Sequence, residues 1–287
     1  MIEFSVIIPT YGRPSQLAVC LRALAGQSYP GDCFEVIVVE DGGNGNSAAV
    51  VDSFRDQLRI TRLEQPHAGP AAARNTGAAR AAGQFLAFTD DDCAPDAGWL
   101  KSLAARFAQA PDCLIGGKTV NGLPNNPYSA TSQAILDVVY EYYNATPDRA
   151  RFFATNNLAL PAARFRALGG LDPAFVTSED REFCERWLQS GYAMVYAREV
   201  VIRHMHDLNL GSLWRQHFHY GCGAFRFHRV RAQRHWGKFR PELGFYAALL
   251  SYPLKHLGSD GSPALLPLLM VAETANAVGF LWQAIQP

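Results

Sequence analysis

The alternation of short apolar runs with amphipathic segments over the first ninety residues constrains the fold most strongly. The apolar runs are rich in branched and aromatic residues, which is typical of strands buried on both faces of a parallel sheet. They predict strands at residues 4–8, 34–39, 59–63 and 84–88, separated by helices that begin near residues 14, 48 and 70. This order predicts an α/β fold with a doubly wound, mostly parallel sheet flanked by helices, whose ligand crevice lies beyond the carboxyl ends of the strands.

The second half of the chain is less regular. The hydrophobic pattern predicts helices at 128–143, 179–189 and 213–234, and extended segments at 152–160 and 193–204. Residues 243–282 are apolar, with breaks expected at Pro253, Pro263 and Pro267. We therefore expect a domain at 1–210 that contains the ligand crevice and a helical C-terminal extension at 211–287.

The charge balance limits the partners of this chain. Its 26 basic and 26 acidic residues cancel, so no global field would draw it onto nucleic acid, and an anionic partner must be bound locally. The N-terminal residues enter the first strand without a preceding basic segment, so no secretory signal is visible and we expect a cytoplasmic protein.

Three consecutive carboxylates, Asp90, Asp91 and Asp92, follow the fourth predicted strand. Side chains alternate along extended backbone, so Asp90 and Asp92 are expected to point together and Asp91 to point away. Paired carboxylates suit a hard cation such as Mg²⁺ or Mn²⁺, which keeps positions open for substrate phosphates. The alternative is a turn that caps the next helix, and this segment alone favours neither interpretation.

Six segments in a fixed order resemble glycosyltransferase family 2 of the GT-A fold, and together they span roughly the first two hundred residues. They are Ser5 to Arg13 (SVIIPTYGR), Val36 to Gly42 (VIVVEDG), Ala73 to Gly77 (ARNTG), Phe85 to Asp92 (FLAFTDDD), Leu168 to Phe175 (LGGLDPAF) and Ser178 to Asp180 (SED). Each segment is weak evidence alone, whereas their order and spacing are specific. The resemblance implies an inverting, nucleotide-sugar-dependent transferase.

The resemblance implies a donor site with a divalent ion, Mn²⁺ or Mg²⁺, at Asp90 and Asp92. UDP is the nucleotide that the family favours, with dTDP and GDP open. Glu40 stands where the family often has an aspartate, which leaves the uracil contact open. The residues that the resemblance assigns to the nucleotide are Pro9, Thr10, Tyr11, Arg13, Asp41, Arg74, Asp90 and Asp91. Arg74 has a second interpretation, as an arginine that braces the sheet or lies on the surface.

The resemblance also makes Asp180 the base that accepts the proton of the attacking hydroxyl. A carboxylate at a helix N-terminus is favoured in the ionised form that a base requires. The alternative is a capping box, Thr177-x-x-Asp180, in which the aspartate only bonds the amide of the cap residue. Further residues expected to line the pocket of the acceptor or the donor sugar are Asn156, Asn157 and Glu179.

Two histidines, His204 and His206, lie on one side of an extended segment. Some relatives in the family use a histidine near this position as an additional metal or phosphate ligand, and position favours His204. An ordinary hydrogen-bonded histidine is an equal alternative.

A basic, aromatic stretch precedes the apolar C-terminal region. Its cations are Arg226, Arg229, Arg231, Arg234, Lys238 and Arg240. The combination suits an anionic membrane surface or a lipid-linked acceptor, and a solvated helix face is the alternative. Residues 264–282 approach the length of a membrane span, but Pro267, Glu273 and Asn276 interrupt them, so we expect an amphipathic helix that contacts a bilayer or a homo-oligomer partner.

Two other functional classes compete with sugar transfer to a hydroxyl acceptor. A nucleotidyltransferase would share the sheet and the metal site, but it should have a glycine-rich basic loop after the first strand, which Thr10 to Arg13 resembles poorly. A non-catalytic sugar-nucleotide binding module would lack the base. The loops at 120–150 and 205–240, which would shape the acceptor pocket, do not distinguish a surface polysaccharide, a glycolipid or a glycosylated metabolite.

Overall fold

The computed structural model describes the chain except for residues 44, 238, 257–264 and 287. The chain forms two compact units, one of Met1–Val120 with Thr146–Met205 and one of Asn121–Ala145 with His206–Pro287. The second unit thus includes residues 121–145, in addition to the predicted extension. The functional boundary at residue 210 stays a prediction, and Lys238 and Pro263 lie outside the described residues.

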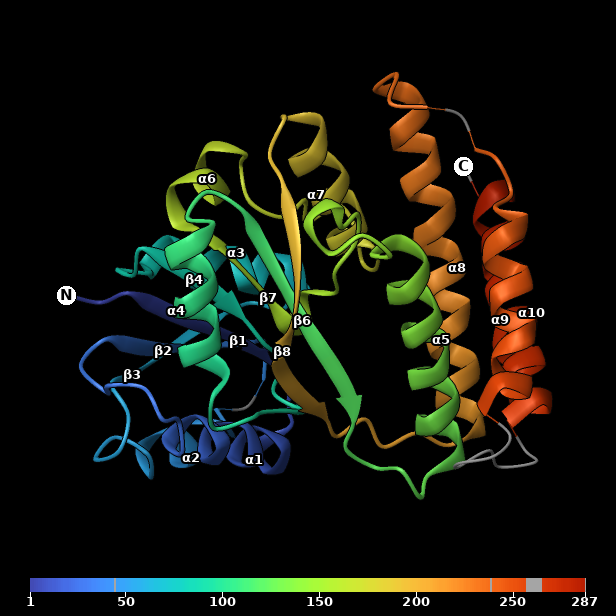
Figure 1. The fold of residues 1–287 in the computed structure, drawn as a ribbon. Helices are drawn as coiled ribbons and strands as arrows, with labels where there is room; N and C mark the ends of the chain where they lie inside the picture. Colours follow the sequence, from blue (N-terminus) through green and yellow to red (C-terminus); the bar gives the residue numbers. More distant parts are fainter. Residues whose placement is uncertain (44, 238, 257–264, 287) are drawn as a thin grey trace. The chain divides into compact units, whose positions relative to one another are not determined.

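A mixed sheet is the centre of the first unit (Figure 1). Within the described residues it has eight strands in the order β3-β2-β1-β4-β7-β6-β8-β5. The strands are β1 Phe4–Thr10, β2 Phe34–Asp41, β3 Ile60–Gln65, β4 Phe85–Phe88, β5 Cys93–Pro95, β6 Leu114–Asn121, β7 Leu158–Pro161 and β8 Met194–His204. The first four pair in parallel, whereas β7 is antiparallel to β4, β6 to β7 and β5 to β8. The predicted α/β fold is confirmed, and the antiparallel half is an addition to it.

Helices cover the sheet of the first unit. They are α1 Pro14–Ala25, α2 Ala48–Asp52, α3 Pro70–Arg80, α4 Trp99–Gln109, α6 Ala162–Ala167 and α7 Glu179–Gln189, with short 3₁₀ turns η1 Pro147–Arg149 and η2 Thr155–Asn157. The leucines of α1 are buried in the same cluster as alternate residues of β1, because one face of each element is apolar. A Cβ on Gly77 of α3 would lie 2.6 Å from Cγ2 of Ile7, so only glycine lets α3 approach β1 this closely.

The strand expected at 152–160 is shorter than predicted, because η2 interrupts it and β7 begins at Leu158. The side chain of Asn157 explains the interruption. Its amide donates to the carbonyls of Lys118 and Val200, both at 3.0 Å, and its Oδ1 accepts from Trp99 Nε1 at 2.9 Å. These hydrogen bonds hold the backbone of η2 in a turn, so that it does not pair with a strand of the sheet.

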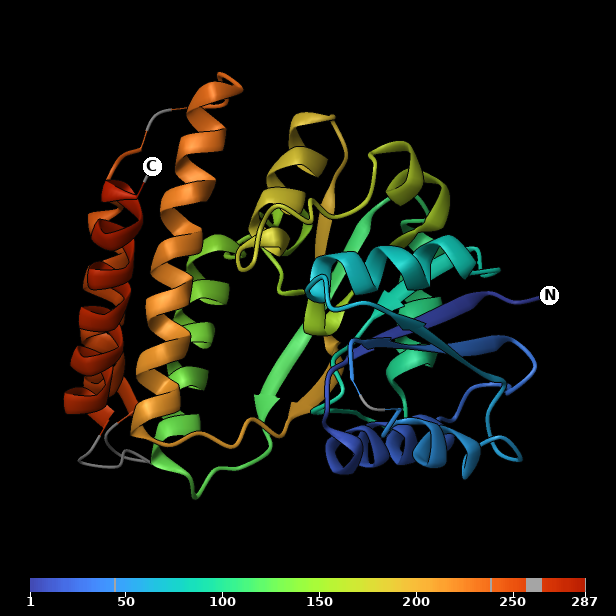
Figure 2. The same ribbon diagram turned by 180° about the vertical axis from the view of Figure 1, so that it is seen from behind.

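The second unit is helical in its described residues, with α5 Pro127–Tyr143, α8 Leu210–Gln233, α9 Leu243–His256 and α10 Leu265–Ile285. Helices α8 and α10 lie side by side (Figure 2). Glycines permit this contact: a Cβ on Gly221 would lie 1.9 Å from the carbonyl oxygen of Asn276, and one on Gly279 would lie 1.9 Å from that of Phe218. The breaks predicted at Pro253 and Pro267 are wrong, since both residues lie inside helices. Pro267 is in the first turn of α10, where proline is tolerated.

Candidate active site

The three carboxylates after β4 lie in a turn. The amide of Cys93 donates to the carbonyl of Asp90 at 3.1 Å, so the backbone reverses where extended structure was expected. The predicted alternation therefore does not hold. Arg13 binds Asp91 and Asp92 together, and Asp90 faces Arg74 instead.

Asp91 is buried beneath the loop that follows β1. Its side chain has no exposed surface, and its oxygens meet the Arg13 guanidinium at 2.5 and 3.1 Å and the Thr10 hydroxyl at 2.7 Å. Burial raises the pKa of Asp91 to about 7, although Arg13 opposes the shift. The burial of Asp91 is therefore at odds with the predicted contact between its side chain and a nucleotide. The carboxylate instead holds Thr10 and Arg13 in place.

Arg74 joins the acidic turn to the helix that carries the predicted base. From α3, one guanidinium nitrogen donates to Asp90 Oδ1 at 2.6 Å and the other to Glu179 Oε1 at 3.0 Å. The arginine side chain is 4% exposed, and those of Asp90 and Glu179 are 25% and 10% exposed. The interpretation as a surface arginine is therefore wrong, and both partners of Arg74 are carboxylates that the family resemblance places in the site.

Asp180 lies in the first turn of α7 and is half-buried. The N-cap of this helix is Ser178, whose φ of 68° is strained for a residue with a side chain, and the helix has no side-chain cap hydrogen bond. The capping box is thus not formed; Asp180 Oδ1 accepts from the amide of Arg181 at 2.7 Å. Burial, reinforced by the charge of Glu179, raises the pKa of Asp180 to about 7, which suits a general base near neutral pH.

His204 lies beside Asp92 because β8 pairs with β5 so that His204 is opposite Cys93. Its Nε2 is 3.3 Å from Asp92 Oδ1. Burial lowers the pKa of His204, but the bond to Asp92 and the nearby carboxylates outweigh burial and raise it. Among the described residues, Asp92, Cys93 and His204 form a group whose ligand atoms lie within 4.8 Å of one another.

The chemistry of these donors can be compared with that of Mn²⁺ or Mg²⁺. Carboxylate oxygens suit both ions and an imidazole suits Mn²⁺, so Asp92 and His204 fit as donors; Asp90, which faces Arg74, is outside this group. Burial raises the pKa of Cys93 well above that of an ordinary thiol. Burial thus disfavours the thiolate form that a soft metal would require.

Two exposed rings lie at the carboxyl edge of the parallel strands. Tyr11, which is 57% exposed, packs on His67 with ring centroids 4.7 Å apart and planes at 33°. Asp41 is buried and holds the loop that carries His67, since its oxygens accept from the amides of Ala68 and Gly69, both at 2.8 Å. Asp41 thus anchors this loop, and its predicted contact with the nucleotide stays a prediction. The sequence analysis did not identify His67, because its position between β3 and α3 is the only signal for it.

Three of the predicted contact residues are buried inside the first unit. Pro9 lies within β1. Asn157 is 1% exposed and its amide is used by the core, so the prediction that it lines a sugar pocket is not supported. Asn156 is 6% exposed, and its Oδ1 accepts from the Thr119 hydroxyl at 3.3 Å.

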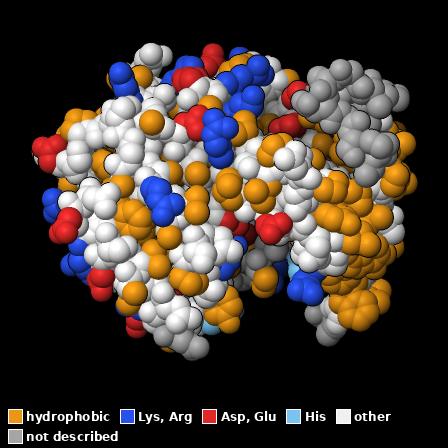
Figure 3. All heavy atoms as spheres, turned by 90° about the horizontal axis from the view of Figure 1, so that it is seen from below, with side chains coloured by type: hydrophobic (Ala, Val, Ile, Leu, Met, Phe, Trp, Pro, Cys, Tyr) orange, Lys and Arg blue, Asp and Glu red, His pale blue; other side chains and the backbone are white. Residues whose placement is uncertain are grey.

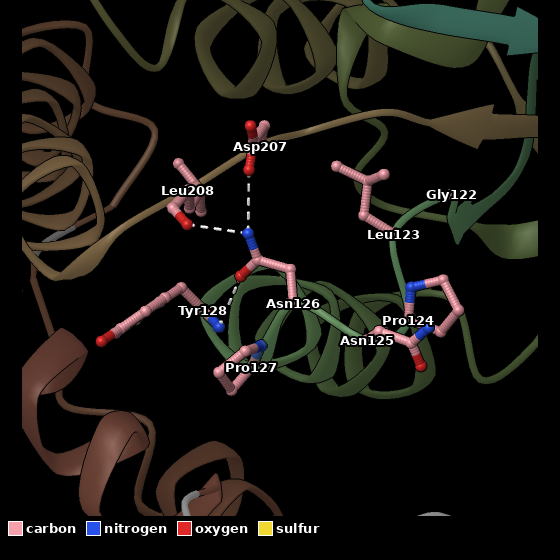
Figure 4. Close-up of a pocket in the computed structure, with 9 residues that line it drawn as sticks. All are labelled: Gly122, Leu123, Pro124, Asn125, Asn126, Pro127, Tyr128, Asp207 and Leu208. Carbon is pink, nitrogen blue, oxygen red and sulfur yellow. Dashed lines mark hydrogen bonds between the residues drawn. The ribbon is translucent and has the colours of Figure 1, made fainter.

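A pocket of about 590 Å³ lies in the second unit, lined by residues 122–128 and 207–208 (Figure 4). Asn126 shapes it: the amide nitrogen donates to Asp207 Oδ1 at 2.9 Å and to the carbonyl of Leu208 at 2.8 Å, while Oδ1 caps α5. The lining comes from the two loop regions that were expected to shape an acceptor pocket.

Comparison with known proteins identifies the family. The model of glycosyl transferase family 2 matches residues 5–167, and that of glycosyl transferase family group 2 matches residues 88–281. The chain belongs to glycosyl transferase family 2. The predicted family and enzyme class are confirmed.

Two curated relatives illustrate the range of the family. Glycosyltransferase AglE of Haloferax volcanii is 28% identical over 77% of this chain and 73% of its own length. The pre-mycofactocin glycosyltransferase of Mycobacterium tuberculosis is 28% identical over 96% of this chain but only 57% of its own length. The chain thus spans little more than half of the second relative.

Two solved structures share the fold. Mannosyltransferase PcManGT from Pyrobaculum calidifontis, in complex with GDP-Man and Mn²⁺, has a TM-score of 0.70 at 17% identity and covers 98% of this chain and 87% of its own. S. aureus TarS 1-349 in complex with UDP-GlcNAc has a TM-score of 0.58 at 17% identity and covers 97% and 89%. At these identities the likeness concerns the fold alone.

Proposed function

We propose that this chain is a metal-dependent, inverting glycosyltransferase that moves a sugar from a nucleoside-diphosphate donor to a hydroxyl acceptor. The bridge of Arg74 between Asp90 and Glu179 carries the proposal. It brings the acidic turn, which suits a metal diphosphate, next to the helix whose second residue is Asp180. A donor site and a base are thereby held together by one buried cation.

The donor nucleotide is proposed to lie at the carboxyl edge of β1 to β4. The exposed ring pair of Tyr11 and His67 offers a stacking surface for a nucleobase. Arg13, whose side chain is 45% exposed, is available to an anionic phosphate while it also binds the acidic turn. UDP is the nucleotide favoured by the family resemblance, and GDP and dTDP stay open. The two similar solved structures hold UDP-GlcNAc and GDP-Man.

The metal is proposed to be Mn²⁺ or Mg²⁺, held by Asp90, Asp92 and His204. When bound, it supplies positive charge that stabilises the departing diphosphate. The proximity of Asp92 and His204 supports the assignment, as does the Mn²⁺ in the similar structure of PcManGT, whereas Asp90 is included from the family resemblance. Arg13 and Arg74 hold the carboxylates of Asp92 and Asp90 in position from either side.

Asp180 is proposed to act as the base in a single displacement. As the acceptor oxygen bonds to the anomeric carbon, its proton passes to the Asp180 carboxylate, and the bond from that carbon to the diphosphate breaks with its electron pair on the leaving oxygen. Attack opposite to the leaving group inverts the anomeric centre. The strained backbone at Ser178 supports a functional role for this turn.

The acceptor is proposed to be a hydroxyl of a surface polysaccharide, a glycolipid or a glycosylated metabolite. A lipid-linked acceptor would suit the basic C-terminal region. The proposed location is the cytoplasm, with peripheral attachment at the inner face of the cell membrane.

A panel of nucleotides tests the donor site first. Thermal unfolding is followed with UDP, GDP, dTDP and CDP, with and without Mn²⁺, because a ligand of the native state raises apparent stability. We expect a metal-dependent rise with one nucleotide, and we expect Asp92→Ala to remove it. The absence of a rise with any nucleotide, in folded protein, would count against the proposal.

Turnover tests the catalytic assignment. Hydrolysis of the matching nucleotide sugar should require Mn²⁺ or Mg²⁺, and Asp180→Asn should abolish it while the nucleotide still binds. Asp56→Asn, which changes an exposed carboxylate of the same unit, is the control and should leave turnover unchanged. Binding without turnover in the wild-type chain would favour a binding module, and release of pyrophosphate from a nucleoside triphosphate would favour a nucleotidyltransferase.

A further inference from the structure

The outward face of α10 is uncharged along its whole length. Within the described residues, every exposed position of this helix is apolar or, at Thr274, a hydroxyl. The large side chains on this face are 42 to 76% exposed and belong to Leu266, Met270, Val278, Leu281, Trp282 and Ile285. Together with the exposed Thr274 between Met270 and Val278, they follow the helical period and so form one continuous stripe.

The polar residues of α10 face the opposite way from those of an ordinary surface helix. Glu273 and Asn276 are half-buried on the side that packs within the unit, together with the fully buried Ala272 and Ala275. Burial raises the pKa of Glu273 to about 7, so this side chain is largely uncharged near neutral pH. A helix that faces water on its outer side would have the reverse distribution.

The helix also differs from a core helix of a soluble protein. Leu265–Ile285 is long and apolar enough to cross a membrane, with a mean hydropathy of 1.5, yet only 22% of its most apolar window is buried. A core helix of that hydropathy would be mostly buried. The exposed stripe thus needs an apolar partner outside the described chain.

Positive charge adjoins this stripe. The rings of Phe225 and Phe239 each lie 5.3 Å from that of Phe280 on α10, so the end of α8 and the segment after it lie against α10. Exposed arginines flank these rings at Arg226 and Arg240. From residue 210 to the last residue the sequence has eight lysines and arginines against three acidic residues, in a chain whose total charges cancel.

We propose that the outward face of α10 lies on the surface of an anionic lipid bilayer, with the arginines near the end of α8 at the headgroups. Figure 3 shows hydrophobic side chains gathered at the right of the view, on the side of α9 and α10. The helix lies in the surface rather than across the bilayer, because its other side is held on α8 by the glycine contacts.

Charge distinguishes the bilayer from a second copy of this chain. A second copy would add its own excess of basic residues to the contact, whereas anionic headgroups complement that excess. Trp282, which is 52% exposed within the stripe, suits the boundary between headgroups and acyl chains.

Vesicle flotation with the full chain tests the proposal. We expect binding to vesicles of phosphatidylcholine with phosphatidylglycerol, weaker binding to phosphatidylcholine alone, and release by salt. Leu281→Ser combined with Trp282→Ser should lower the affinity at least about tenfold, since interfacial binding scales with the apolar area that is buried. Arg226→Gln and Arg240→Gln should each lower it about fivefold on the anionic vesicles only.

Matched variants on the first unit control for changes in general surface character. Val176→Ser removes an exposed apolar side chain, 73% exposed, and Arg80→Gln removes an exposed arginine; neither should alter flotation. Circular dichroism verifies that each variant is folded. The proposal is overturned if the folded wild-type chain floats with neither vesicle. It is also overturned if sedimentation shows a stable dimer that the Leu281/Trp282 variant dissociates, because a second copy would then cover the stripe.

Discussion

Replacement of Arg74 by methionine removes the buried cation between the acidic turn and the base helix. Methionine retains most of the apolar stem, so the change leaves little cavity and acts chiefly on charge. Arg74 makes hydrogen bonds of 2.6 and 3.0 Å to two carboxylates, and its own side chain is 4% exposed. Hydrogen bonds to charged groups contribute about 1.5–3 kcal/mol each.

Asp90 and Glu179 differ in how far water can replace the lost hydrogen bond from Arg74. Asp90 is 25% exposed and regains water, whereas Glu179 is 10% exposed and would be left as a buried charge without its cation. We therefore expect the free energy of unfolding to fall by about 3–5 kcal/mol, as for other broken buried pairs. Urea denaturation followed by circular dichroism measures this difference.

Arg80→Met, on the same helix but exposed, is the matched control, and we expect it to change stability by less than about 0.5 kcal/mol. If Glu179 is the stranded charge, then Glu179→Gln in the Arg74→Met background should recover about 1–2 kcal/mol. A loss below about 1 kcal/mol for Arg74→Met, or one equal to that of Arg80→Met, would refute this reasoning.

The same variant should have a characteristic pH dependence. Burial already raises the pKa of Glu179 above its unfolded value, even with Arg74 opposing. When the pKa of a carboxyl group is higher in the folded than in the unfolded state, ionisation lowers the free energy of unfolding. This loss is absent below the unfolded pKa and grows as pH rises towards the folded pKa. Without Arg74 the folded pKa rises further. The unfolded pKa is the same for both proteins, so the difference in stability between wild type and Arg74→Met should be constant at low pH and widen as pH rises through the folded pKa of Glu179 in the wild type.

Three other changes test separate parts of the structure. The pKa of Asp180 is raised to about 7, so its basic form predominates only above that pH. The transfer rate should therefore increase with pH through about 7 and then level off. A flat pH profile would exclude Asp180 as the base. Gly279→Ala places a methyl 1.9 Å from the carbonyl oxygen of Phe218 and should destabilise the protein in urea by about 1–3 kcal/mol, whereas Gly31→Ala, with open space at its Cβ, should not. Tyr11→Ala should weaken nucleotide binding about fivefold to tenfold in calorimetry with unchanged stability, because its ring is 57% exposed; unchanged affinity would contradict the stacking role.

Local sequence pattern determined the elements that carry the site. The runs that became β1, β2 and β4 are mostly apolar, and every position in them is buried because both faces of each strand are covered; the leucines of α1 recur at the helical period. The acidic residues after β4 and at the start of α7 could be located in the same way, as could the family, because its segments keep their order along the chain. These are properties of neighbours in sequence, which a sequence displays directly.

Tertiary structure alone decided which of these groups meet. Arg74 and Glu179 are 105 residues apart, and nothing local to either shows that they share a hydrogen bond. The sequence separated Asp91 from Asp90 and Asp92 by an alternation that the structure does not have, since a turn and the contacts with Thr10 and Arg13 determine the direction of Asp91.

The orientation of α10 in the second unit was likewise decided by tertiary structure. The composition of α10 indicated an amphipathic segment, but only its packing on α8 through Gly221 and Gly279 shows that the polar side faces inward and the apolar side outward. Periodicity records which residues share a face of a helix. It does not record what that face meets, because the partner surface is built from residues distant in sequence.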